Sequence, residues 1–507
     1  MIKNRVNSMK IAFMCDMHLP NNPSSSQYAY FSAMIEKLKA DRVKTVISVG
    51  DITSFGEKEI FIKYMEDMKD FDHHYVIGNS DVRDEKTKDY FIENSGGFSI
   101  RRDGRTILGV DTPYGVIADT DKEKILQLKD GDVLVIHYYV EALKMGGYPF
   151  LKEVCKEKAL TVIVGHEHKR RDYIFGRSRV IGLRALDPDK SIGGYPCIDC
   201  FDFGGNDVTY EEITIKTPLN VLADIRAHFG ISCVDNLRDL TYALENNVYA
   251  VELRTDSSGW TPDPSLIPLI EKWREKTGGY LSVHFPDLGY SNGEIVGKKR
   301  WDVVTEYAIA IKANGITMHP PRRVKRCDMP KSGEIWQKFA DVYIDTIRKL
   351  PATVQIGIEN LHMEAGEADN MQRSFGYTPA EVSDWIDTLN TALSSQSRVG
   401  HTLDVGHARN NGHLSQIYPI SRWYEIMGSK AVAYHIHQVM LDEREMYNHN
   451  AIENWFGPLI NYASFFYSWE NNVINHKPIF LEVRGSVPYQ KSVEAFDTLL
   501  RDGDILS

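Results

Sequence analysis

Eight short runs of apolar and β-branched residues recur through the last ~290 residues, and stretches with helical spacing separate them. This alternation constrains the fold more than any other feature, because strands joined by helices form parallel sheets. Eight strand–helix units of this size are typical of a (β/α)8 barrel. The expected strands lie at 219–224, 249–253, 280–283, 315–318, 354–358, 400–403, 431–434 and 478–481.

The first part of the chain also alternates between strand-like and helix-like segments, but their spacing differs from that of the last ~290 residues. Strands are expected at 10–15, 45–49, 74–77, 133–136 and 161–164, with helices at 27–39 and 57–69. The rhythm changes at Lys216-Thr217-Pro218, so we predict two domains, residues 1–216 and 217–507. The expected fold is α/β, with an α/β sandwich followed by a (β/α)8 TIM barrel.

Composition excludes several classes of protein. Hydrophobic residues make up 42% and charged residues 25% of the chain, which is ordinary for a globular protein. No apolar run approaches the ~20 residues that span a bilayer, and the first residues lack the apolar stretch of a signal peptide. We therefore expect a cytoplasmic protein without a membrane partner. The net charge of −11 disfavours extended duplex DNA as a partner, and a homo-oligomer is left open.

Five fragments rich in oxygen and imidazole donors follow the expected strands of the first domain. They are Asp16-Met17-His18, Gly50-Asp51, Gly78-Asn79-Ser80-Asp81, His137 and Gly165-His166-Glu167-His168. Loops at strand ends are where α/β proteins build their sites. Two divalent cations about 3.5–4 Å apart can clamp a phosphate during in-line attack, and they need a bridging carboxylate with further Asp, His and amide ligands. The five fragments supply that set.

In the same order, these fragments resemble the DxH, GD, GNH(D/E), H and GHxH blocks of the calcineurin-like metallophosphoesterase family, over about residues 9–215. The resemblance implies a phosphodiesterase or phosphatase with two divalent cations (Mn²⁺, Fe²⁺ or Zn²⁺), in which Asp51 and Asn79 are catalytic. It implies a first metal site from Asp16, His18, Asp51 and His168. It implies a second site from Asp51, Asn79, His137 and His166, with Asp51 as the bridge.

Ser80 departs from the family pattern, which carries a histidine at this position. General-acid assistance worth ~10²–10⁴-fold is therefore in question, and we expect diesters with good leaving groups to be favoured over alkyl monoesters. Asp81 remains as a third catalytic candidate and is expected to orient His18 or a water molecule. Arg170 and Arg184 are candidates for binding the substrate phosphate.

Polar residues again follow the strands of the second domain, at the end of a barrel where catalytic groups converge. They are His284, His319, Glu359, Asp404, His407, His435, His449 and Glu482. A single histidine of this kind is usually a satisfied core residue, but so many on separate strands indicate a site. The set resembles the xylose isomerase-like barrel superfamily over residues 219–507, and its short sequence motifs are similar to those of endonuclease IV. The resemblance implies one to three divalent cations (Zn²⁺ or Mn²⁺), with Glu359 and Glu482 as catalytic residues.

Two departures from the endonuclease IV pattern bear on the number of cations. Tyr447 stands where that family has an aspartate, and Gln438 replaces another, so one or two cations are expected rather than three. Both His435 and His437 point to the same side of a strand, so alternation does not separate them. We favour His435 as the ligand because of its place in the motif.

Three functions follow from these motifs. The first is a bifunctional metal-dependent phosphoester hydrolase, whose barrel acts on a phosphorylated small molecule, a nucleotide, a nucleic-acid end or a sugar phosphate. The second makes the barrel a sugar or sugar-phosphate isomerase or epimerase, with Glu359 and Glu482 exchanging a proton. The third is a metal-stabilised binding scaffold without catalysis.

Overall fold

The computed structural model describes residues 10–95, 97–204, 208–257, 259–363, 372–394, 398–442 and 445–505. The chain divides into two compact units. The first comprises Met1–Lys216 with Asn461–Ala463, and the second comprises Thr217–Ile460 with Ser464–Ser507. Both units mix helices and strands, which confirms the predicted α/β class.

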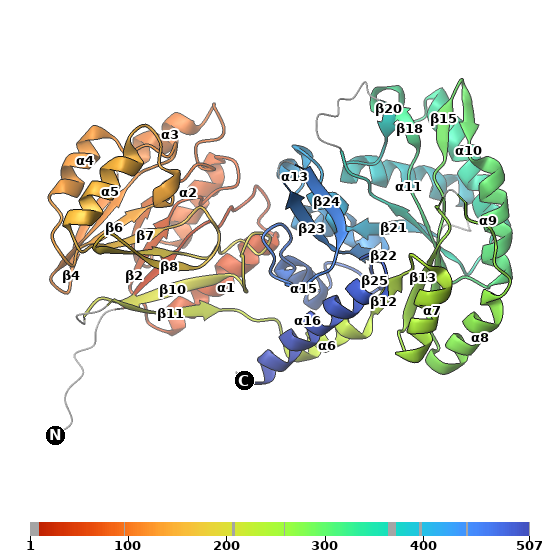
Figure 1. Ribbon diagram of the computed structural model, residues 1–507. Coiled ribbons are helices and arrows are strands. Elements are labelled where there is room, and N and C mark those ends of the chain that lie inside the picture. The colour runs from red at the N-terminus through yellow and green to blue at the C-terminus, as the bar shows by residue number, and fades with distance from the viewer. Residues whose placement is uncertain are drawn as a thin grey trace. The chain divides into compact units, whose positions relative to one another are not determined.

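The first unit contains two β-sheets (Figure 1). The five-stranded sheet has the order β11-β10-β1-β2-β3. Its strands are β1 (Ile11–Met14), β2 (Thr45–Val49), β3 (Asp72–Val76), β10 (Cys197–Asp202) and β11 (Thr209–Thr214). The six-stranded sheet has the order β4-β5-β6-β7-β9-β8. Its strands are β4 (Phe98–Arg102), β5 (Arg105–Val110), β6 (Val133–Ile136), β7 (Thr161–Val164), β8 (Arg171–Phe175) and β9 (Ser178–Gly182).

One apolar core joins the two sheets, and helices cover their other faces. Phe13 and Ile47 of the first sheet pack with Val135 and Ile163 of the second. Two further cores lie under the helices α1 (Ser26–Ala40), α2 (Lys58–Asp67), α3 (Lys88–Asn94), α4 (Asp119–Leu126) and α5 (Gly147–Glu157). Strands β1, β2, β6 and β7 are therefore buried along their whole length, which accounts for their continuous apolar sequences.

The second unit is a closed barrel of eight parallel strands, as the sequence predicts. The strands are β12 (Phe229–Ser232), β13 (Ala250–Arg254), β14 (Tyr280–His284), β17 (Gly315–Met318), β19 (Gln355–Glu359), β21 (Val399–Asp404), β22 (Ala431–Ile436) and β25 (Ile479–Leu481). The longer helices of this unit are α7 (Asn236–Glu245), α8 (Leu266–Thr277), α9 (Lys298–Ala310), α10 (Glu334–Lys349), α11 (Pro379–Leu393), α14 (Ile420–Met427), α15 (Ala463–Glu470) and α16 (Ser486–Ile505).

The predicted first barrel strand was wrong. Residues 219–224 belong to helix α6 (Leu219–Ala227), and the first strand is β12. The buried apolar residues of α6 are Leu222 and Ile225, whose spacing of three is helical and not the spacing of two that a strand requires. Pro218 stands immediately before the helix, where its missing N–H costs nothing.

Short strands extend the loops that follow β14, β17, β19 and β22, at the C-terminal end of the barrel. Four of them form the sheet β16-β15-β18-β20, from β15 (Gly289–Ser291), β16 (Glu294–Val296), β18 (Arg322–Lys325) and β20 (Gln372–Ser374). A hairpin of β23 (Gln438–Asp442) and β24 (Glu445–Asn450) follows β22 (Figure 1). In the described part of the chain, no helix combines the length and the apolar character needed to cross a membrane.

Candidate metal centres

The first donor group of the N-terminal unit gathers at the ends of β1, β2 and β7. The ligand atoms of Asp16, His18, Asp51 and His168 all lie within 4.8 Å of one another. His18 Nε2 lies 3.4 Å from His168 Nε2, and His168 Nε2 lies 3.4 Å from Asp16 Oδ1. Two imidazole nitrogens and two carboxylates that point at one another form a donor set that suits a divalent cation.

The second donor group contains Asp51, His137 and His166 and so shares Asp51 with the first. His137 Nε2 lies 3.4 Å from Asp51 Oδ1 and 3.3 Å from His166 Nδ1. The Asn79 amide oxygen lies 3.2 Å from His137 Nε2. Hydrogen bonding alone favours the opposite amide orientation, with nitrogen toward both imidazoles. A cation reverses that preference because it needs the oxygen, so the residues present fit a second ion.

The backbone around these donors adopts unusual conformations. Asp16, His18, Asp51, His166 and His168 have positive φ values of 51°, 44°, 52°, 72° and 60°. Such conformations cost on the order of 1–3 kcal/mol each in non-glycine residues and cluster at functional sites. The surrounding loops therefore hold the backbone of these five residues in a conformation that non-glycine residues disfavour.

Burial and charge oppose each other in the carboxylates of this cluster. Burial acts to raise the pKa of Asp51, but His137 and His18 hold that pKa well below its usual range. Burial acts to lower the pKa of His137, yet the Asp51 carboxylate raises it to about 9. The pair therefore has an anionic oxygen at the centre of the cluster, which is what a bridging ligand requires.

Asp81 forms hydrogen bonds with two neighbouring loops and not with His18. It accepts hydrogen bonds from the Thr53 backbone N–H (2.8 Å), the Thr53 hydroxyl (3.1 Å) and the Gly78 backbone N–H (2.9 Å). His18 instead contacts the Ser80 hydroxyl, which lies 3.3 Å from its Nδ1. Burial and the neighbouring Asp51 charge raise the pKa of Asp81 to about 7. Asp81 thus ties two loops together, and Ser80 is the residue beside His18.

Arg170 and Arg184, the expected phosphate-binding residues, are already paired with carboxylates. Arg170 contacts Asp199 and lies 3.1 Å from Glu212, and Arg184 contacts Glu212. Their charges are therefore balanced on β10 and β11. Sequence reasoning did not identify Arg83. In the amide orientation of Asn79 that hydrogen bonding favours, Arg83 Nη2 lies 3.3 Å from the amide oxygen. The position of Arg83 four residues after Asn79 was the available signal.

Glu359 at the end of β19 is the centre of the barrel cluster. His284 Nε2 lies 3.1 Å and His319 Nε2 lies 3.3 Å from its Oε2, and His407 Nδ1 lies 3.2 Å from its Oε1. Burial acts to raise the pKa of Glu359, but the imidazoles of His435 and His319 hold it well below the usual range. Glu359 is therefore an anion surrounded by imidazoles from four different strand ends.

His435 brings the second carboxylate, Glu482, into the same cluster. Its Nδ1 lies 3.1 Å from Glu482 Oε2 and 3.5 Å from Glu359 Oε2. His435 Nδ1, Glu482 Oε2 and Asp404 Oδ2 are buried and have no hydrogen bond to the described residues. Buried polar atoms without hydrogen bonds are costly, and a cation beside His435 Nδ1 and Glu482 Oε2, which lie 3.1 Å apart, satisfies both. The residues present therefore fit a divalent ion.

Glu252, in the middle of the barrel, faces the other nitrogen of His435. Its Oε2 lies 2.9 Å from His435 Nε2. Three hydroxyl groups, of Ser232 (3.2 Å), Ser282 (3.2 Å) and Thr317 (2.7 Å), donate to the same carboxylate. Burial acts to raise the pKa of Glu252, but His435 holds it below its usual value. An ionised carboxylate only accepts, so when a cation takes His435 Nδ1 the ring proton lies on Nε2 and faces Glu252.

His437 and His449 close the cluster on its other side. His437 Nε2 lies 3.3 Å from Asp404 Oδ1, and the His449 backbone N–H donates to His437 Nδ1 at 2.9 Å. His449 Nδ1 lies 3.6 Å from Glu482 Oε2. Tyr447, which replaces an expected aspartate, is 48% exposed. Both His435 and His437 are thus buried in the cluster, each facing a different carboxylate.

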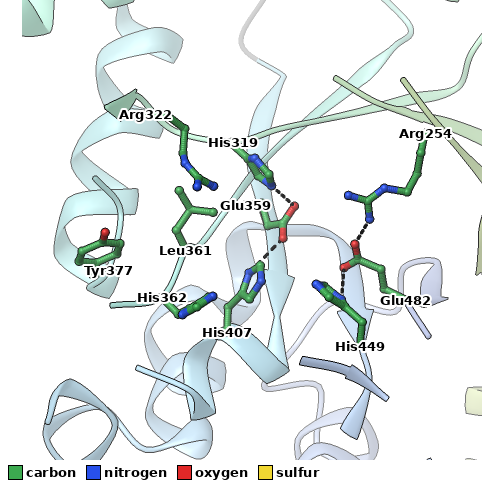
Figure 2. Close-up of a pocket in the computed structure, with 10 residues that line it drawn as sticks. All are labelled: Arg254, His319, Arg322, Glu359, Leu361, His362, Tyr377, His407, His449 and Glu482. Carbon is green, nitrogen blue, oxygen red and sulfur yellow. Dashed lines mark hydrogen bonds and ion pairs between the residues drawn. The ribbon is translucent and has the colours of Figure 1, made fainter. Parts of the chain in front are cut away.

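A pocket of about 210 Å³ opens onto this cluster (Figure 2). Besides the expected residues it is lined by Arg254, Arg322, Leu361, His362 and Tyr377, which sequence reasoning missed. The basic run at 322–326 was a visible signal for Arg322. Glu252 and Arg254 lie in or at the end of an ordinary-looking strand and gave no comparable signal.

The protein is thus an α/β protein of two units, and each unit has a cluster of carboxylates and imidazoles at the ends of its strands. The family model of the calcineurin-like phosphoesterase superfamily domain matches residues 9–183, so the N-terminal unit carries such a domain. No curated protein matches the chain.

Three solved structures illustrate what the chain is similar to. A D-tagatose 3-epimerase-like protein is 17% identical over 55% of this chain and 98% of its own, with a TM-score of 0.36. Endonuclease IV from Thermus thermophilus is 13% identical over 55% and 100%, with a TM-score of 0.37. A conserved uncharacterized protein described as a predicted phosphoesterase, from Streptococcus pneumoniae, is 11% identical over 41% and 89%, with a TM-score of 0.25.

Proposed function

We propose that the N-terminal unit is a metal-dependent phosphoesterase that cleaves phosphodiesters with good leaving groups in preference to alkyl monoesters. The observation that carries this proposal is the pair of donor groups that share Asp51. Two divalent cations (Mn²⁺, Fe²⁺ or Zn²⁺), when bound, would stabilise the charge that develops on a phosphate under attack. Asp51 bridges the two groups, and Asn79 supplies an amide oxygen to the second.

The side chains around the donors determine which esters react well. Ser80 donates its backbone N–H to Asp51 Oδ1 at 2.8 Å and its hydroxyl lies beside His18. A serine hydroxyl is a far weaker acid than an imidazolium, so the leaving group departs with little proton assistance. Asp81 holds the loops of Thr53 and Gly78 in place and thereby positions Asp51 and Asn79.

Substitution of Asp51 tests this part of the proposal. Asp51→Asn is expected to lower the hydrolysis of bis-p-nitrophenyl phosphate with added manganese by several orders of magnitude, because both donor groups lose their shared anion. Circular dichroism establishes that the variant is folded. Near-normal turnover in a folded variant would refute the assignment of Asp51 and of the dinuclear site.

For the barrel we propose a metal-dependent hydrolase that acts on a phosphorylated small molecule, a nucleotide, a nucleic-acid end or a sugar phosphate. The support is the number of donors: imidazoles of His284, His319 and His407 surround Glu359, in addition to the group around His435 and Glu482. So large a set suits more than one divalent cation (Zn²⁺ or Mn²⁺). The protein would then be bifunctional.

An isomerase or epimerase is the second candidate for the barrel. The observation that favours it is the placement of both Glu359 and Glu482 beside His435 Nδ1, at 3.5 and 3.1 Å. Two carboxylates that flank one cation can remove and return a proton on a carbohydrate substrate. Metal content distinguishes the two reactions. Two or more equivalents in the barrel favour hydrolysis, and one equivalent favours isomerisation.

A further inference from the structure

The pocket at the barrel mouth has two chemically different sides. Figure 2 shows Glu482, His449 and Arg254 on one side, Glu359 in the middle, and Arg322 with Tyr377 on the other. The side with Glu482 belongs to the candidate metal cluster. Among the described residues, those that line the opposite side are Arg322, Leu361, His362 and Tyr377, and none of these four is a carboxylate.

The two arginines of the pocket differ in how far their charges are balanced. Arg254 pairs with Asp256 through two nitrogens, at 3.1 and 2.7 Å, and also contacts Glu482. Arg322 pairs loosely with Asp287, whose Oδ2 lies 3.8 Å from its Nε. The other oxygen of Asp287 is occupied by His319 Nδ1 at 2.5 Å. Arg322 therefore supplies positive charge to a pocket in which Arg254 is already neutralised.

Arg322 is also held on a rigid element. It lies on β18, opposite Gly289 of β15 and Ser374 of β20, and its backbone N–H donates to Leu288 at 2.9 Å. Close by, His362 Nδ1 is buried and has no hydrogen bond to the described residues. A guanidinium with several N–H donors and an unsatisfied imidazole nitrogen, both on a pocket wall, form a suitable receptor for a phosphate group.

We propose that Arg322 binds the phosphate group of a small phosphate monoester, whose hydroxyl or carbonyl end faces the cluster of Glu359 and Glu482. This inference rests on the second function proposed for the barrel, the isomerase or epimerase, because the carbohydrate end and not the phosphate faces the metal cluster. It narrows the substrate class to a phosphorylated monomer. A pocket of about 210 Å³ is smaller than most drug-sized sites and suits a molecule the size of a sugar phosphate.

The test uses the full chain with Asp51→Asn, so that the N-terminal site contributes little phosphate binding. The protein is loaded with manganese, its metal content is measured, and calorimetry compares ribose 5-phosphate with ribose. Any binding that remains in the N-terminal unit is the same in all variants and cancels. Arg322→Gln is expected to weaken ribose 5-phosphate binding roughly tenfold to a hundredfold and to leave ribose binding unchanged.

Two further variants make the result specific. The affinity of Arg322→Lys for ribose 5-phosphate is expected to fall between that of the parent and that of Arg322→Gln, because lysine keeps the charge but loses the fork of parallel donors. Arg323→Gln is the matched control, since Arg323 is the next residue of β18, is exposed and does not line the pocket. Its affinity for ribose 5-phosphate is expected to equal that of the parent.

The outcomes separate the two proposals. A barrel that binds no manganese refutes the proposed function. Normal manganese content with equal ribose 5-phosphate affinity in Arg322→Gln and the parent refutes the role of Arg322 alone. Tighter binding of ribonate than of ribose 5-phosphate would refute phosphate as the recognised group and indicate a carboxylate.

Discussion

Glu252→Gln is expected to weaken divalent-cation binding in the barrel about tenfold while the fold is retained. Glu252 is fully buried and lies 2.9 Å from His435 Nε2, so it favours the ring with its proton on Nε2, which is the form that binds a cation through Nδ1. Glutamine has the same shape, and its amide oxygen can still accept from Nε2. It lacks the negative charge that makes this hydrogen bond about twice as strong as a neutral one.

The magnitude follows from the partners that glutamine keeps and loses. Loss of a carboxylate that orients a metal-binding histidine typically lowers metal affinity 10- to 100-fold. Because glutamine keeps the acceptor oxygen, we expect Glu252→Gln to lose metal affinity near the lower end of this range, about tenfold or about 1.4 kcal/mol of binding free energy. Glu252→Leu keeps no acceptor for His435 or for the hydroxyls of Ser232, Ser282 and Thr317, and we expect the upper limit, about 2.8 kcal/mol.

Competition with a chromophoric chelator measures these affinities in the full chain carrying Asp51→Asn, where the N-terminal site is impaired. Glu271→Gln is the matched control, because it removes one carboxylate from an exposed position of α8. Thermal unfolding without metal separates a packing defect from a binding defect. If Glu252→Gln binds metal as tightly as Glu271→Gln does, Glu252 has no influence on His435 and the reasoning fails.

Four other substitutions have defined outcomes. Ser80→His is expected to raise hydrolysis of diesters with poor leaving groups more than of p-nitrophenyl diesters, and an equal effect on both would argue against Ser80 as the missing acid. Glu359→Gln is expected to lower metal content in the barrel alone and Asp51→Asn in the N-terminal unit alone, as measured by metal analysis. Loss from both units in either variant would indicate one composite site. Gly406→Ala is expected to lower the free energy of unfolding by about 1–3 kcal/mol, because the new Cβ would lie 1.8 Å from the His437 ring. Unchanged denaturant unfolding would show that the ring can move away.

Much of the fold was predictable because strand and helix periodicities are local properties of the chain. The run Val133–Ile136 is apolar throughout and is buried on both faces, which is what a central parallel strand requires. The strand prediction for 219–224 failed because six residues are compatible with both strand and helix spacing. Only the packing of Leu222 and Ile225 selects the helix. The direction of each strand and the barrel closure then follow from short right-handed connections.

The sequence by itself determined which donors follow each strand, since Asp16 and His18 or Asp404 and His407 lie a few residues apart. Parallel strands end at the same edge of a sheet, so donors at those ends converge. Only the tertiary structure decided what surrounds them. Glu252 and His435 are far apart in sequence and meet inside the barrel, and Arg170 is neutralised by Asp199 of β10. Periodicity reports which side of its own element a side chain faces, whereas charge balance depends on neighbours that chain folding brings from elsewhere.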